Sequence, residues 1–193
     1  MNMGLIIILG LFFILLLVIG SIVAAHNDII RGKNQAKRAW SDVVAYELKK
    51  LKILPGFRDA LEEYKEFEKD VLEKITTLRS SLSKLSQHDI EPEKMQEVRD
   101  TTQGLLRGLN VTFEAYPNLK SSDLYSHWMK ELSDLEGNIT AAIAIFNEAV
   151  EAFNNSIQTF PSSAINNLWN KEGVLNTFTD TKASGELEYQ PNF

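Results

Sequence analysis

The sequence predicts an all-α protein in which an N-terminal transmembrane helix is followed by an antiparallel four-helix bundle with long helices. Three observations predict this fold class: an uncharged apolar run, apolar residues at helical spacing through the rest of the chain, and short turns between the helical segments. With 193 residues, 44% hydrophobic and 24% charged, the chain suits one globular domain with a core. We expect a membrane anchor at 1–25, a helical bundle at 26–169 and a partly ordered tail at 170–193.

The anchor is the run MGLIIILGLFFILLLVIGSIVAA, residues 3–25, which contains 23 consecutive uncharged residues. A helix of this length is roughly 35 Å long, enough to cross a hydrocarbon core of about 30 Å. The run is apolar on every face, unlike the striped helix of a soluble core. A cleaved signal peptide is the main alternative, since Val23-Ala24-Ala25 offers small residues. We favour an uncleaved anchor because there is no basic segment before the run, which also exceeds the usual length of roughly 7–15 residues.

Charge is distributed unevenly around this anchor. Four basic residues follow it closely and are called the basic collar here: Arg31, Lys33, Lys37 and Arg38. They favour a cytoplasmic body with a short N-terminus outside, and they leave the opposite orientation open. The collar is also expected to face anionic lipid, at about 1 kcal/mol for each basic residue, unless it serves topology alone. Beyond residue 58 the chain carries 12 basic and 23 acidic residues, which argues against binding to nucleic acid.

Four helical segments are predicted after the anchor, because apolar residues recur at alternating spacings of three and four. The first continues the anchor without a break and is expected to end at Pro55-Gly56. The fourth closes at Pro161, ahead of a short helix at 162–169. The apolar stripes begin, in order, with Ala36, Trp40 and Val43; with Phe57, Leu61 and Tyr64; with Met95, Val98 and Thr102; and with Trp128, Leu132 and Leu135.

Short turns are expected between these segments. Residues 87–89 end the second segment, and Pro92 suits the first position of the third helix. Pro117 stops the third segment, and the small polar residues at 121–123 suit the N-terminal cap of the fourth. A connection this short makes the third and fourth helices antiparallel neighbours.

No catalytic, cofactor-binding or metal-binding residue is predicted. The chain has no cysteine, which excludes disulfides and thiolate sites. None of its three histidines, His26, His88 and His127, follows a glutamate by three residues, so the di-iron bundle motif is absent. His127 and Glu131 are interpreted as a hydrogen bond on a helix surface. The mixed charges at 62–74 are interpreted as a solvated helix face.

The fourth segment repeats the pair Phe-Asn seven residues apart, as Phe146-Asn147 and Phe153-Asn154. This heptad spacing is typical of coiled-coil packing and places the two pairs on one face of the helix. The phenylalanines are expected in the core, and the asparagines are expected to fix helix register at the edge of the seam. A groove for a partner is the less favoured interpretation of the same face.

Over nearly its whole length the chain resembles the bacterial LemA family. The resemblance rests on Arg38-Ala39-Trp40-Ser41, the segment EAYPNLK at 114–120, and motifs near the end of the fourth helix. Its signature residues here are Trp40, Tyr116, Pro117, Leu119, Lys120, Asn147, Asn154 and Pro161. Departures such as His26-Asn27, where the family usually has Tyr-Asn, suggest a divergent member. The resemblance implies a single-pass membrane protein with a helical bundle, without an established enzymatic activity or catalytic residues.

These observations favour a non-enzymatic adaptor or scaffold at the cell membrane. Its expected partners are the lipid bilayer and other membrane or envelope proteins, and self-association is left open. The alternative is a sensory bundle that binds a small molecule or ion. That alternative predicts a buried polar cluster and an interior pocket, whereas the apolar stripes contain few polar residues to line one.

Overall fold

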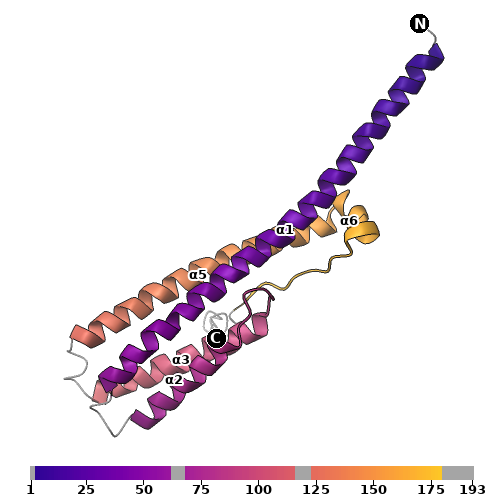
Figure 1. The fold of residues 1–193 in the computed structure, drawn as a ribbon. Helices are drawn as coiled ribbons and strands as arrows, with labels where there is room; N and C mark the ends of the chain where they lie inside the picture. The colour runs from indigo at the N-terminus through magenta and orange to yellow at the C-terminus, as the bar shows by residue number, and fades with distance from the viewer. Residues whose placement is uncertain (1–2, 62–67, 116–122, 180–193) are drawn as a thin grey trace, which may run out of the picture. The chain divides into compact units, whose positions relative to one another are not determined.

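The computed structural model describes residues 3–61, 68–115 and 123–179, and every regular element in these ranges is helical. The elements are α1 (Met3–Leu61), α2 (Glu68–Ser83), α3 (Pro92–Ala115), α5 (Asp123–Gln158), α6 (Ser162–Ile165) and the π-helical turn η1 (Asn166–Asn170) (Figure 1). The all-α class and the long N-terminal helix are therefore as predicted. The antiparallel four-helix bundle as a whole remains a prediction.

Helix α1 runs for 59 residues, so the apolar run and the first segment of the body form one continuous helix, as expected. The prediction that Pro55-Gly56 ends this helix is wrong, since α1 continues to Leu61. Proline lacks an N–H and usually kinks or breaks a helix. Packing outweighs that preference here, because Ile53 and Leu54 are buried and the ring of Trp128 lies against Gly56.

The second predicted segment is also divided differently. Residues 57–61 belong to α1, and α2 begins at Glu68. The predicted turn at 87–89 is confirmed, and α3 begins at Pro92 as expected. Of the proposed start of the fourth segment, only Asp123 lies within the described residues, where it opens α5.

The described residues divide into two compact units. The larger unit spans residues 37–146 and 178–193, with residues 62–67, 116–122 and 180–193 outside the description. Within it, α1 and α5 run antiparallel. Successive residues along α1, namely Trp40, Lys50 and Gly56, contact residues that lie progressively earlier in α5. The contacting residues of α5 are Phe146, Glu136 and Trp128.

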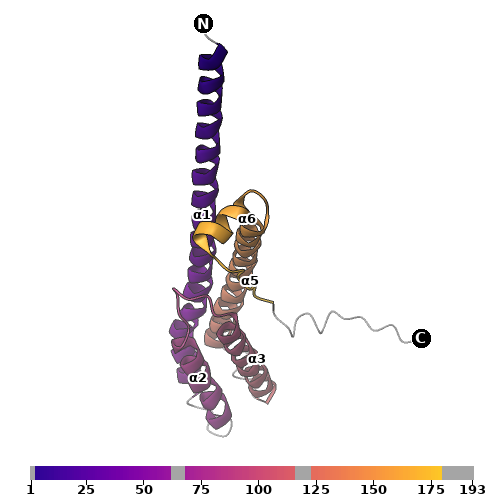
Figure 2. The same ribbon diagram turned by 90° about the vertical axis from the view of Figure 1, so that its right-hand side faces the viewer.

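In the same unit α2 and α3 pack side by side and antiparallel, as both views show (Figures 1 and 2). Trp40 anchors the core. Its side chain is fully buried, its ring lies 5.2 Å from that of Phe146, and its Nε1–H donates to the Ser86 carbonyl at 2.9 Å. This bond ties α1 to the turn between α2 and α3. Buried residues of the other three helices follow the predicted stripes: Val71, Ile75, Leu78 and Leu82; Met95, Val98, Leu105 and Leu109; Leu132, Leu135, Ile139 and Ala142.

The smaller unit spans residues 1–36 and 147–177, of which residues 1–2 are outside the description. A small core of Ile29, Phe153 and Ile157 joins α1 to the end of α5, with Leu175 packed against it. Of the helices that the structure describes, only α1 has a stretch long and apolar enough to cross a membrane. This stretch is its first part, drawn in indigo in Figure 1. Its apolar side chains from Leu5 to Ile19 are all exposed.

Candidate functional site

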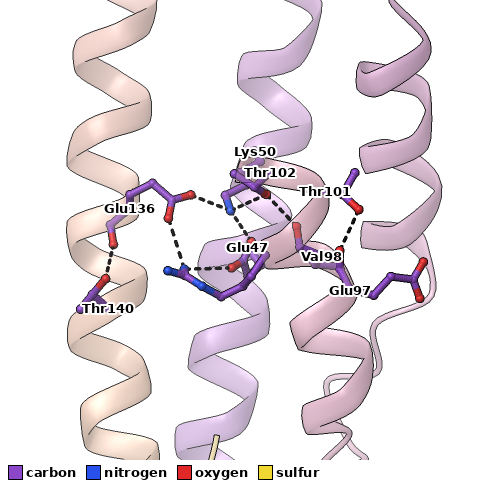
Figure 3. A network of polar contacts seen from close by, with 9 residues as sticks. Glu47, Lys50, Glu97, Val98, Thr101, Thr102, Glu136 and Thr140 are labelled. Atoms are coloured by element: carbon purple, nitrogen blue, oxygen red, sulfur yellow. Dashed lines mark hydrogen bonds and ion pairs between the residues drawn. The ribbon is translucent and has the colours of Figure 1, made fainter. Parts of the chain in front are cut away.

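The most unusual feature of the larger unit is a group of four charged side chains inside it, called the charged cluster here: Glu47 and Lys50 of α1, Arg99 of α3 and Glu136 of α5. Lys50 Nζ lies 2.7 Å from Glu47 Oε2 and 2.7 Å from Glu136 Oε1 (Figure 3). A guanidinium nitrogen of Arg99 lies 3.2 Å from Glu136 Oε2 and 3.9 Å from Glu47 Oε1. Three helices therefore contribute to one network.

Burial is uneven across this cluster. The side chains of Glu47 and Lys50 are 0% and 1% exposed, whereas those of Arg99 and Glu136 are 15% and 25% exposed. Thr102 adds a polar contact, since Lys50 Nζ donates to its hydroxyl at 3.1 Å, and that hydroxyl donates to the Val98 carbonyl at 2.9 Å. All three donor positions of the Lys50 ammonium thus have a partner: two carboxylates and a hydroxyl.

Burial raises the pKa of Glu47 above its usual range, because the charged carboxylate loses its hydration. The positive charge of Lys50 opposes this shift most strongly, and Arg99 opposes it more weakly. The negative charge of Glu136 acts in the same direction as burial. Desolvation is the largest of these effects, so Glu47 holds a proton more tightly in the folded chain than in water.

The cluster contains two cations and two anions, so its formal charge is zero. A neutral and internally paired cluster has no excess charge that would demand a counter-ion. Buried ion pairs are weak evidence for stability, and their best-attested role is to fix one arrangement of packed elements. The charged cluster is therefore suited to fixing the positions of α1, α3 and α5 relative to one another along their axes.

Open grooves lie along the surface where α1 meets α5. One has a volume of about 430 Å³ and is lined partly by small residues, together with Tyr46 and Lys49 of α1 and Ile145 of α5. The small lining residues are Ala39, Ala45, Ala141 and Ala142. A second groove of about 560 Å³ shares Lys49 and Asn138 with the first. The side chain of Ile145 is 61% exposed, which is unusual for an isoleucine on a bundle helix.

The second groove collects several residues that the sequence singled out. His127, Trp128 and Glu131 of α5 line it opposite Lys52 and Ile53 of α1. The ring of His127 lies edge-on to that of Trp128 at 5.2 Å. Among the residues that the structure describes, no group of three or more His, Cys, Asp or Glu side chains is arranged to hold a metal ion.

The structure places the four residues of the basic collar in different surroundings. Arg31 is exposed and pairs with Asp28 at 3.5 Å along the helix. Lys33 is half-buried and forms an ion pair with Glu172 at 2.6 Å. Lys37 and Arg38 are exposed. A role of this collar in lipid contact remains a prediction.

Of the signature residues, four can be located. Trp40 is in the core, Asn147 is half-buried, and Pro161 is exposed in the turn after α5. Asn154 is half-buried. Its side-chain amide nitrogen donates to the Leu175 carbonyl, and its amide oxygen accepts from the Leu175 N–H, each at 2.9 Å. The other four, Tyr116, Pro117, Leu119 and Lys120, lie outside the described residues.

Sequence reasoning missed the charged cluster, although a signal for it was present. Glu47 and Lys50 fall at helical spacing between Val43 and Leu54, on the apolar stripe of α1 rather than beside it. A charged pair three residues apart within an apolar stripe indicates burial with partners on other helices.

A comparison with protein families identifies the family of this chain. A family model described as the LemA family matches residues 39–186, about three quarters of the chain. The chain belongs to the LemA family. The matched region includes the whole charged cluster and both grooves, while the apolar run and the basic collar precede it.

A curated relative agrees with this assignment. The chain is 35% identical over 143 residues to Protein LemA of Metamycoplasma hominis, and the alignment covers 74% of this chain and 64% of that protein. The chain thus spans less than two thirds of the length of this LemA relative. The name states a family and no reaction, substrate or partner.

Proposed function

We propose that this LemA-family chain is a membrane-tethered, non-enzymatic adaptor that binds other membrane or envelope proteins beside the bilayer. The apolar part of α1 is the tether, and the helical body carries the binding surface. The basic collar favours a cytoplasmic body with the short N-terminus outside. The single observation that carries the binding role is the first groove between α1 and α5.

This groove has the features of a site for a helix of a partner protein. Its alanine lining lets another backbone approach closely, and the exposed side chain of Ile145 offers an apolar contact. An amphipathic helix that lies in such a groove buries its apolar face. Asp42 and Lys49 line the same groove and offer opposite charges for polar residues of the partner helix.

Site-specific photo-cross-linking in intact membranes tests the adaptor role. A photoreactive amino acid is placed at Tyr46 or Ile145, on the two sides of the groove, and at exposed Asn110 of α3 as a control. We expect the two groove positions to capture the same protein and the control position to capture none of it. Adducts with lipid alone, or the same adducts at Asn110, would contradict the proposal.

A matched variant strengthens this test. Ala141 lines the groove and is exposed, so Ala141→Trp fills the groove without entering the core. We expect this variant to lose the adduct while its helicity and thermal unfolding stay as in the wild type. An adduct of undiminished yield would show that the partner lies elsewhere.

The charged cluster favours one second candidate, a sensory bundle that binds an ion or small molecule. This alternative predicts two features, a buried polar cluster and an interior pocket. The charged cluster is a feature of the first kind. Against it, the four charges balance and contact one another. A thermal-shift measurement of the full chain in detergent, against a panel of metal ions, anions and metabolites, separates the two functions. A rise in melting temperature with one compound would favour the sensor, and a uniform absence of shifts would remove it.

A further inference from the structure

Three large apolar side chains of the smaller unit are exposed in the short stretch of chain that follows α5. Phe160, Leu168 and Trp169 are 85%, 68% and 62% exposed. They belong to the turn after Gln158 and to η1, a stretch of about ten residues. Exposed apolar surface of this kind is a candidate for contact with another apolar surface.

A groove identifies that surface. Phe160, Pro161 and Ile165 line an apolar groove of about 400 Å³ together with residues of α1, namely Ile14, Leu17, Val18, Ser21 and Ile22. The one hydroxyl in this set, that of Ser21, donates to the Leu17 carbonyl at 2.9 Å and is satisfied within the helix. The residues of α1 in the groove all belong to the uncharged run that the proposed function assigns to the membrane. The groove therefore opens to lipid.

The depth of the segment follows from its contacts along α1. About 20 residues cross a hydrocarbon core, so a span that begins at Met3 ends near Ile22. Phe160 and Pro161 lie beside the last part of this span. Farther along, Asn170 Oδ1 lies 2.8 Å from His26 Nδ1.

The polarity of these contacts changes in the order expected across a membrane surface. They change from apolar at Ile22 through a polar pair at His26 to the ion pair of Lys33 with Glu172 at 2.6 Å. Helical rise puts Lys33 about 16 Å beyond Ile22. The polar region on one side of a bilayer is only about 5–8 Å thick, so the ion pair lies in water.

Several backbone groups of the turn are hydrogen-bonded within the chain, which lowers the cost of placing them in an apolar environment. The N–H groups of Thr159 and Ser163 donate to the carbonyls of Asn155 and Thr159, at 3.0 and 2.8 Å. Pro161 has no N–H, and its carbonyl accepts from Ala164 at 3.2 Å. The Thr159 hydroxyl also donates to Asn155. Paired backbone groups are the condition for entering hydrocarbon.

We propose that residues 159–169 form a second membrane contact, in the leaflet nearest the body, in which a phospholipid acyl chain fills the groove beside α1. Phe160 enters the hydrocarbon, and Trp169 lies at the interface, where tryptophan is enriched in membrane proteins. This contact rests on the proposed membrane tether. It is apolar, so it needs no anionic lipid.

Depth-dependent fluorescence quenching tests this contact in the full chain. Because the chain has no cysteine, single variants carry one label each: Phe160→Cys, Trp169→Cys, Phe12→Cys in the anchor and Glu151→Cys on the exposed face of α5. Each is labelled with an environment-sensitive fluorophore and reconstituted into phosphatidylcholine vesicles. The vesicles carry a nitroxide either on the acyl chain or on the headgroup.

We expect the labels at 12 and 160 to shift to shorter wavelength and to lose fluorescence with the acyl-chain nitroxide. The label at 169 should respond more to the headgroup nitroxide, and the label at 151 to neither. Quenching at 12 with a response at 160 like that at 151 would overturn the second contact and leave the tether intact. No quenching at 12 would overturn the tether itself.

One further outcome identifies a different occupant. A label at 160 that shifts to shorter wavelength but is not quenched by either nitroxide would lie against protein, such as α1 of a second copy. That result would overturn the lipid assignment. Phe160 is 85% exposed, so its replacement removes little packing and the fold is retained in this variant.

Discussion

The ammonium of Lys50 lies 2.7 Å from a carboxylate oxygen of Glu47, and both side chains are almost completely buried in the larger unit. They are three residues apart on α1, so the helix itself holds them together. Arg99 and Glu136 extend the pair to α3 and α5. This relationship makes the interior of the body sensitive to any change that leaves one of the charges alone.

Loss of the Lys50 charge is the first test of this sensitivity. Lys50→Met keeps most of the side-chain volume and leaves Glu47 buried without its closest cation. We expect the free energy of unfolding to fall by about 3–5 kcal/mol, the cost of breaking a buried ion pair from one side. Urea unfolding in detergent micelles, followed by circular dichroism, measures it.

Two further variants separate charge burial from a loss of packing. Lys52→Met changes an exposed residue of the same helix and should alter stability by no more than about 0.5 kcal/mol. The double variant Glu47→Leu with Lys50→Met removes both charges and should recover part of the loss. A double variant less stable than Lys50→Met alone would contradict the role assigned to the pair.

The pH dependence of stability follows from the raised pKa of Glu47. Between the unfolded pKa of about 4.5 and its higher folded value, the folded chain binds more protons than the unfolded chain. The contribution of Glu47 to stability is therefore present at the acidic end of this window and is lost as pH rises through it. Glu47→Gln cannot titrate, so its stability relative to the wild type should improve as pH rises through the window.

Unfolding free energies of the two proteins, measured side by side from about pH 4 to pH 8, check this sign. Their difference isolates Glu47 from the other titrating groups, which are common to both chains. Parallel curves, or a difference that falls as pH rises, would show that desolvation is not the dominant effect on this carboxyl.

The sequence was sufficient to predict the helices because their apolar spacing is regular. Trp40, Leu78 and Ile139 of the predicted apolar stripes are buried as expected. Pro92 begins α3, as its place after the predicted turn indicated. These features depend on the chemistry of neighbouring residues and on an apolar period of about 3.6 residues. Both can be read from a single sequence.

Features that depend on distant partners were predicted incorrectly or missed. Pro55 was read as a helix end, but the packing of Gly56 against Trp128, 72 positions away in the chain, favours continuation of α1. The charged cluster required knowledge of which faces of three helices meet. The hydrogen bonds of Asn154 with the backbone of Leu175, 21 positions away, were also missed.

Gly56 provides a sharp test of the packing that carries α1 past Pro55. A Cβ at this position would overlap the ring of Trp128, so Gly56→Ala forces the ring to move. We expect a loss of about 1–3 kcal/mol from overpacking, even though alanine favours a helix over glycine. Gly104→Ala and Gly137→Ala lie in helices with open space and should stabilise the chain by about 0.5–1 kcal/mol.

A double-mutant cycle assigns this loss to the named contact. In a Trp128→Leu background the smaller side chain leaves room for the new methyl group, so Gly56→Ala should cost less than in the wild type. Equal costs in both backgrounds would mean that the backbone near Pro55, rather than the Trp128 ring, sets the requirement for glycine.

Asn154 is predicted to hold the chain segment that follows η1. Its amide nitrogen donates to the Leu175 carbonyl, and its amide oxygen accepts from the Leu175 N–H, each at 2.9 Å. Asn154→Ala removes both bonds and leaves two half-buried backbone groups without this partner, a cost of about 1–3 kcal/mol for the local structure. Hydrogen exchange of residues 171–177 should therefore become about 5- to 150-fold faster, the rate change that this free energy corresponds to. Asn155→Ala, at the exposed neighbouring position, should leave this exchange unchanged. Faster exchange in both variants would indicate a general loosening of α5, and unchanged exchange in Asn154→Ala would show that the small core around Leu175 holds the segment without the asparagine.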